Sequence, residues 1–140
     1  MATVTKIGHI AIAVENLEEA REFWETKLGI PMERSETVTS QKAKVAFFPL
    51  GGSEIELVEP TSASTGTAKF IAKRGPGMHH LCLEVDDIEE MMASLRTKGV
   101  RLIDETPVDL GDRKMAFIHP RSTGGVLIEL YQVISPDSFA

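Results

Sequence analysis

The sequence predicts an α+β protein made of two βαβββ modules, which pair into a curved, partly open eight-stranded barrel around a shared cavity. Two internal repeats support this prediction. Residues 7–14 recur as residues 78–85, and residues 51–57 recur as residues 124–130. In each copy a strand-like alternation of apolar residues is followed by a helical pattern and then by three further strand patterns. The chain therefore consists of two copies of one structural module.

Length and composition are those of an ordinary globular protein. The chain has 140 residues, of which 42% are apolar and 26% charged, so one compact domain over residues 1–140 is expected. The net charge of −6 argues against a general nucleic-acid binder. A lone cysteine, Cys82, indicates a reducing compartment. No apolar run matches a membrane span or a signal peptide, so we expect a cytoplasmic protein without nucleic-acid or membrane partners.

Module one is expected over about residues 5–60. In the strand at residues 6–14, Ile10, Ile12 and Val14 face the core, whereas His9 shares the other face with small residues and lines a space. Asn16 is placed to cap the following helix. Four apolar residues at helical spacing continue that helix to Gly29, where it should end: Leu17, Ala20, Trp24 and Leu28.

The remaining elements follow from turn and periodicity signals. Three strands are expected in module one, at residues 31–38, 43–50 and 53–59, with a Gly51-Gly52 turn. The connector, residues 61–77, contains a short helix near residues 67–74. Module two, about residues 78–134, repeats the plan: its helix begins after Asp87 and ends at Gly99, and its last three strands lie near residues 100–105, 113–119 and 125–133. Residues from 135 onward are expected to form a frayed tail.

The repeats also place four polar residues at equivalent positions. His9 corresponds to His80, and Glu56 corresponds to Glu129. A pseudo-twofold arrangement would bring all four to one centre, where imidazole nitrogens and carboxylate oxygens suit a divalent first-row metal. Such an ion acts as a Lewis acid toward substrate oxygens. A single histidine on a strand is usually a core residue, but the recurrence at repeated positions favours ligands.

Two other histidines receive a different interpretation. His79 points to the face opposite His80, where it packs or forms hydrogen bonds. His119 precedes Pro120 at the end of a strand, so a structural role or a place at the pocket rim is expected.

Several segments resemble a known family. Residues 7–14, 67–75, 77–88 and, most specifically, 117–130 are similar to the vicinal oxygen chelate superfamily and, within it, to the methylmalonyl-CoA epimerase family. The resemblance implies a homodimeric isomerase of propionate metabolism that interconverts (2R)- and (2S)-methylmalonyl-CoA through a metal-stabilised enolate. It assigns the metal ligands to His9, Glu56, His80 and Glu129, and the ion to Co²⁺ in the first place, with Mn²⁺, Ni²⁺ or Zn²⁺ as alternatives.

The resemblance leaves the proton-transfer groups open. Some relatives carry a glutamate base where this chain has Val45. Glu129 and Glu56 are therefore the candidate catalytic residues, with Glu129 preferred. Four basic residues are candidates for binding the phosphates of coenzyme A: Lys73, Arg74, Lys114 and Arg121.

Other functions are compatible with parts of this pattern. Glyoxalase I (lactoylglutathione lyase) shares the superfamily and can use the same His-Glu-His-Glu set, although residues 117–130 favour the epimerase. A non-catalytic ligand-binding protein of this fold would generally lack the metal set. Extradiol dioxygenases use two histidines and one carboxylate, so a fourth protein ligand makes that class a poorer match.

Overall fold

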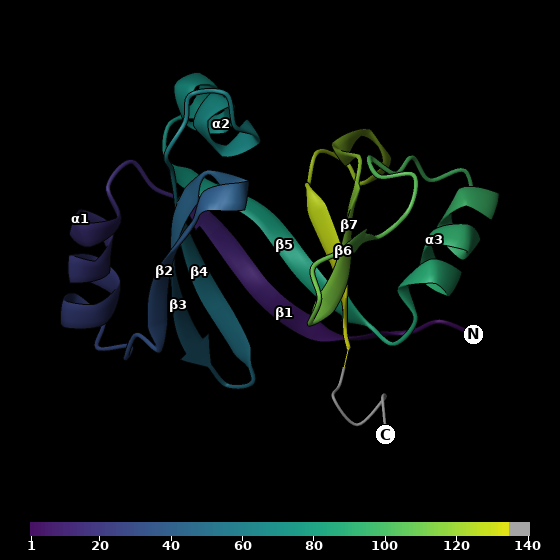
Figure 1. Ribbon diagram of the computed structural model, residues 1–140, viewed down its shortest axis with the longest axis horizontal. Coiled ribbons are helices and arrows are strands. Elements are labelled where there is room, and N and C mark those ends of the chain that lie inside the picture. Colours follow the sequence, from purple (N-terminus) through teal and green to yellow (C-terminus); the bar gives the residue numbers. More distant parts are fainter. Residues whose placement is uncertain (135–140) are drawn as a thin grey trace. The chain divides into compact units, whose positions relative to one another are not determined.

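The computed structural model describes residues 1–134, which form two compact units (Figure 1). The first unit is His9–His79, and the second consists of Met1–Gly8 together with the residues from His80 onward. The expected tail after residue 134 lies outside the described residues. None of the helices in residues 1–134 is long and apolar enough to span a bilayer.

The first unit contains the sheet order β2-β3-β4-β1. β2 (Arg34–Val38), β3 (Ala43–Leu50) and β4 (Ser53–Pro60) are antiparallel neighbours, and β1 (Val4–Ala13) runs parallel to β4. A short 3-10 helix, η2 (Thr39–Gln41), joins β2 to β3. The turn between β3 and β4 has positive φ at Gly51 and Gly52, which is why glycines occupy it. The two predicted strands on either side of this turn are confirmed.

The helix after β1 begins as predicted and then changes type. The Oδ1 of Asn16 accepts a hydrogen bond from the Glu19 amide at 3.0 Å and caps α1 (Leu17–Arg21). The next turn is a π-helix, η1 (Glu22–Lys27), in which the Leu28 amide donates to the Phe23 carbonyl. Because a π turn is wider than an α turn, Leu28 leaves the apolar face and is 53% exposed. The prediction of one regular helical stripe through Leu28 was therefore wrong.

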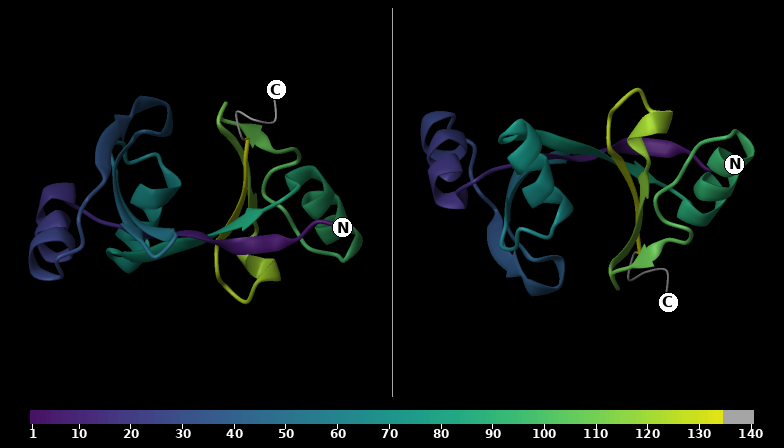
Figure 2. Two further views of the ribbon diagram at one scale, coloured as in Figure 1. Left: turned by 90° about the horizontal axis from the view of Figure 1, so that it is seen from below. Right: turned by 90° about the horizontal axis from the view of Figure 1, so that it is seen from above.

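Both faces of this sheet carry buried apolar residues, and the two sets differ. Between α1 and the sheet lies a core that includes Val14, Leu17, Phe48 and Leu57. The other face buries Ala11, Val45, Phe47 and neighbouring residues. Helix α2 (Gly66–Arg74), capped by Thr65, lies on the opposite side of the sheet from α1 (Figure 2).

The second unit has the strand order β5-β8-β7-β6. β5 (Gly77–Val85) and β8 (Ile128–Val133) are parallel, while β7 (Arg113–Ile118) is antiparallel to both β8 and β6 (Val108–Asp109). Helix α3 (Ile88–Thr97) begins after Asp87, whose Oδ1 accepts from the Glu90 amide at 3.0 Å. A 3-10 helix, η3 (Pro120–Ser122), follows β7. Helix α3 covers one face of the sheet (Figure 1) over a core that includes Ile88, Met92 and Leu130.

The strand predicted at residues 100–105 does not form. Leu102 makes only an isolated bridge with Ile118, and the short edge strand β6 comes later. The carboxylate of Asp104 accepts a hydrogen bond from the Phe117 amide at 2.7 Å. A side chain thus takes the place of a backbone carbonyl, and a regular ladder does not continue.

Residues Met1–Gly8 form hydrogen bonds within the second unit. The Thr3 amide donates to the Asp86 carboxylate at 2.8 Å, and the Thr3 carbonyl accepts from the Asp86 amide at 3.2 Å.

Each unit has the predicted βαβββ order, and the α+β class is confirmed. All eight strands within residues 1–134 belong to one sheet, as predicted, whereas the shared cavity stays a prediction.

Candidate metal centre

The first unit contains a His–Glu pair with little exposed surface. His9 lies on β1 and Glu56 on β4, and the His9 Nε2 is 3.3 Å from the Glu56 Oε2. Only 6% and 13% of the two side chains are exposed. The parallel register pairs Glu56 with Ala11, so the histidine stands two residues before the strand partner of the glutamate.

The second unit contains the same arrangement. The Nε2 of His80, on β5, is 3.1 Å from the Oε1 of Glu129, on β8, with 10% and 7% of the side chains exposed. Here Glu129 pairs with Cys82, again two residues after the histidine. The ring of Phe117 meets His80 edge-on, with 5.5 Å between the ring centroids, and thereby restricts the imidazole. The structure thus places the four predicted residues in two equivalent pairs, one in each unit.

The donor atoms of each pair fit neighbouring positions on one divalent ion. With ligand distances of about 2.1 Å, donors 90° apart on one ion are separated by about 3 Å. The two measured separations are close to this value. Burying an imidazole beside a carboxylate is costly unless the two are paired or coordinate a metal. In both units the pairing already meets this requirement. The donor chemistry suits a first-row metal, and the role of these residues as ligands stays a prediction.

Cys82 belongs to this site, although sequence reasoning did not include it. Its side chain is completely buried, and the thiol donates to the Oε2 of Glu129 at 3.3 Å. The other oxygen of the same carboxylate is the one nearest His80. A signal was present in the sequence, because the repeat that aligns His9 with His80 also aligns Ala11 with Cys82.

The candidate phosphate-binding residues lie in various environments. Lys114 forms an ion pair with Glu89 at 2.8 Å, and this contact raises the pKa of Lys114 and lowers that of Glu89. The guanidinium of Arg74 lies 5.7 Å from the centroid of the Phe70 ring. Lys73 and Arg121 are exposed. The ion pair of Lys114 competes with phosphate binding, and the phosphate-binding role of Lys73, Arg74 and Arg121 stays a prediction.

The two remaining histidines have structural contacts. The Nδ1 of His119 accepts a hydrogen bond from the Arg121 amide and so caps η3, in line with the structural role predicted for it. His79 packs edge-on against Phe70 of α2, with 5.0 Å between the ring centroids.

Tyr131 packs closely on β1. Its hydroxyl donates to Glu84, and burial, followed by the charge of Glu84, raises its pKa. A Cβ atom placed on Gly8 would overlap the phenol ring, so a larger residue there would require the ring to move.

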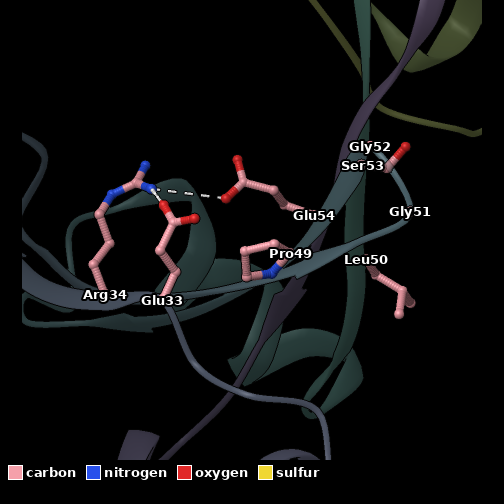
Figure 3. Close-up of a pocket in the computed structure, with 8 residues that line it drawn as sticks. All are labelled: Glu33, Arg34, Pro49, Leu50, Gly51, Gly52, Ser53 and Glu54. Atoms are coloured by element: carbon pink, nitrogen blue, oxygen red, sulfur yellow. Dashed lines mark hydrogen bonds and ion pairs between the residues drawn. The ribbon is translucent and has the colours of Figure 1, made fainter.

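A pocket of about 380 Å³ lies at the β3–β4 turn of the first unit (Figure 3). Arg34 reaches across it, with its guanidinium 2.7 Å from Glu33 and 3.7 Å from Glu54. The same guanidinium lies 3.9 Å from the centroid of the Phe47 ring. Neither His9 nor Glu56 lines this pocket, so we do not assign the chemistry to it.

Comparison with known proteins defines the class of this chain. The glyoxalase/bleomycin resistance protein/dioxygenase superfamily matches residues 8–117. Because this match covers most of the sequence, the chain belongs to that superfamily, and the resemblance found in the sequence is confirmed.

Its relatives include an uncharacterized protein and several epimerases. YqjC of Bacillus subtilis is 40% identical over 91% of both chains. Human mitochondrial methylmalonyl-CoA epimerase is 35% identical over 91% of this chain and 73% of that protein. The methylmalonyl-CoA epimerase structure from Mycobacterium tuberculosis is 36% identical, with a TM-score of 0.87 and coverage of 98% and 93%. The two epimerases among these relatives are isomerases, which confirms the predicted enzyme class.

One solved relative carries a ligand. A methylmalonyl-CoA epimerase that is 30% identical, with a TM-score of 0.87 over 95% of this chain and 97% of that one, is in complex with methylmalonyl-CoA and NH₄⁺.

Proposed function

We propose that this protein is a metal-dependent epimerase that interconverts (2R)- and (2S)-methylmalonyl-CoA. The observation that carries the proposal is the His–Glu pair, with little exposed surface, at equivalent strand positions of both units, in a chain related to methylmalonyl-CoA epimerases. Four residues would hold the ion: His9, Glu56, His80 and Glu129. Co²⁺ is the first expectation, and Mn²⁺, Ni²⁺ and Zn²⁺ suit the same donors. When bound, the ion supplies Lewis-acid stabilisation of negative charge developing on substrate oxygens.

The reaction requires a proton to leave one face of C2 and return to the other. This C–H bond lies between a thioester and a carboxylate, so its electron pair can delocalise into the thioester carbonyl as an enolate. A carboxylate oxygen of the protein takes the proton, and a second group delivers one to the opposite face. Val45 has no titratable group. We therefore assign the two proton transfers to Glu129 and Glu56, with Glu129 the stronger candidate.

The remote part of the substrate is expected to supply binding energy. Coenzyme A carries phosphates, and Lys73, Arg74 and Arg121 are exposed cations that can meet them. Lys114 would first have to leave Glu89. Free methylmalonate lacks this handle, so it should react far more slowly than the thioester.

The direct test is proton NMR of methylmalonyl-CoA in D₂O with the metal-loaded enzyme. Loss of the C2 proton signal together with racemisation is expected. Methylmalonate and the glutathione hemithioacetal of methylglyoxal serve as comparison substrates. Turnover of the hemithioacetal at a comparable rate would assign the protein to glyoxalase I, and tight binding of the thioester without any exchange would indicate a non-catalytic binding protein.

A second test addresses the proposed base. Glu129→Gln keeps an oxygen ligand but removes the basic carboxylate. We expect bound metal, measured by elemental analysis, to remain while C2 exchange falls by at least about 100-fold. Glu56→Gln serves as the matched variant in the other unit and should lose less activity. Near-normal exchange in the metal-loaded Glu129→Gln protein would exclude Glu129 as an essential base.

A further inference from the structure

The two His–Glu pairs are equivalent in position but not in surroundings. In both units the glutamate lies beside a phenylalanine on the antiparallel neighbour strand, Phe47 or Phe117. On its parallel neighbour strand, however, Glu56 meets Ala11, whereas Glu129 meets Cys82. Alanine has no hydrogen-bond donor, and a thiol has one.

The thiol of Cys82 is directed at the glutamate. Its Sγ lies 3.3 Å from the Glu129 Oε2, and the cysteine has no exposed surface. Glu129 is itself only 5% exposed. Its other oxygen, Oε1, lies 3.1 Å from the His80 Nε2. The two carboxylate oxygens thus have different partners on β5: Oε1 lies next to His80, and Oε2 accepts from Cys82, two residues further along the strand.

We propose that Cys82 is a positioning residue for the Glu129 carboxylate. By donating to Oε2, the thiol fixes the plane of the carboxylate and leaves Oε1 on the side of His80. Hydrogen bonds of this kind orient metal ligands and affect metal affinity and activity. In this role Cys82 acts as a hydrogen-bond donor to Glu129 and not as a metal ligand. The inference rests on the proposed metal role of Glu129, and it makes the two half-sites different, because only the second unit places a thiol beside the glutamate.

The hydrogen bond can be tested without any metal. Cys82 is the only cysteine in the chain, so the S–H stretching band in the infrared spectrum belongs to it alone. In the metal-free protein we expect the band at the lowered frequency of a hydrogen-bonded thiol. Glu129→Ala removes the acceptor and should move the band to higher frequency. A band that does not move would overturn the proposal.

The effect on metal binding is tested by competition with a chromophoric chelator for Co²⁺. Cys82→Ala makes the second unit resemble the first, and we expect its Kd to rise by about 10- to 100-fold. Cys82→Ser keeps a donor of similar size and should bind within about threefold of the unsubstituted protein. Ile118→Val is the control for a purely structural effect. It removes one carbon from the core on the opposite face of the sheet in the same unit, and it should leave the Kd for Co²⁺ unchanged.

The outcomes separate this inference from the proposed function. If the unsubstituted protein binds no divalent metal, the proposed function fails, and this inference fails with it. If it binds Co²⁺ and Cys82→Ala binds equally well, only the positioning role is overturned. A strong near-ultraviolet thiolate-to-cobalt absorption that disappears in Cys82→Ser would also overturn it, because it would make Cys82 a ligand.

Discussion

At the scale of single residues, Gly8 lies against the side chain of Tyr131, which belongs to the distant strand β8. A Cβ atom at this position would overlap the ring of Tyr131. We expect Gly8→Ala to lower the free energy of unfolding by about 1 to 3 kcal/mol, the usual cost of overpacking. Urea denaturation measures this change. Adding Tyr131→Leu, which removes the overlapping atoms, should recover part of the loss.

Gly66 provides the matched control for this prediction. It has no atom within 4 Å of an added Cβ and no positive φ. Gly66→Ala should therefore be neutral or slightly stabilising, because alanine restricts the unfolded chain without strain in the folded one. Equal destabilisation by the two substitutions would show that the Tyr131 contact is not the cause.

The residues of the candidate site were predictable to different degrees. The positions of His9, His80, Glu56 and Glu129 followed from the repeats, because equivalent residues of equivalent strands fall at equivalent places. The contact of Cys82 with Glu129 was not predicted, because it depends on the register between β5 and β8, which alternation within one strand does not determine. The same limitation applies to the packing of Tyr131 on Gly8.

At the scale of elements, the start of α3 depends on Asp87. Its carboxylate accepts from the amide of Glu90, which would otherwise lack a partner in the first turn. We expect Asp87→Ala to reduce the free energy of unfolding by about 1 kcal/mol. Asp87→Asn keeps an accepting oxygen and should lose only part of this amount. If both variants were as stable as the unsubstituted protein, the cap would not contribute to stability.

Helix α3 is also connected to β7 through the ion pair between Glu89 and Lys114. The pKa of Glu89 is lowered in the folded protein, so the pair stabilises the fold above the ordinary carboxyl value of 4.5 and loses this effect as the pH falls through the folded pKa. The pKa of Lys114 is raised, so the effect is present below 10.5 and is lost as the pH rises through the folded pKa of the lysine.

A pH series of urea denaturation tests this pair. At pH 7 and low salt we expect Lys114→Gln to be slightly less stable than Lys98→Gln. Lys98 is an exposed lysine at the C-terminal end of α3, away from Glu89, and its substitution makes the same change in net charge. The difference should disappear in acid, when Glu89 is protonated, and shrink in high salt because both groups are accessible to solvent. A difference that persists in acid would point to packing of the lysine stem instead.

The elements that sequence reasoning misjudged have local physical causes. The apolar spacing through Leu28 is that of an α-helix, and nothing in that spacing indicates the π turn that begins at Glu22. The residues near position 103 have a strand composition, but the Asp104 carboxylate takes the Phe117 amide. This competition between a side-chain acceptor and a backbone acceptor can be recognised only when the positions of both partners are known.

At the scale of the whole molecule, the repeat in the sequence and the compact units of the structure do not divide the chain at the same places. The repeat suggests modules near residues 5–60 and 78–134, whereas residues Met1–Gly8 belong with the second unit. β1 therefore begins in one unit, and from His9 onward it continues in the other. An internal repeat indicates which residues are equivalent, but it does not indicate to which compact unit each residue belongs.

Whether the two His–Glu pairs serve one ion is a question for the whole protein. A ligand that binds only the folded state at 100 times its Kd adds about 2.7 kcal/mol to stability. For a chain of this size we expect the melting temperature to rise by roughly 5 to 15 °C when Co²⁺ is added. If one ion uses both pairs, His9→Ala and His80→Ala should each abolish the rise, although they lie in different units. His119→Ala serves as the control: it removes the side chain that caps η3, so it should lower the melting temperature without metal and still show the full rise. A rise that is lost in only one of the two site variants would mean that a single pair binds the ion, and the shared centre would then be wrong.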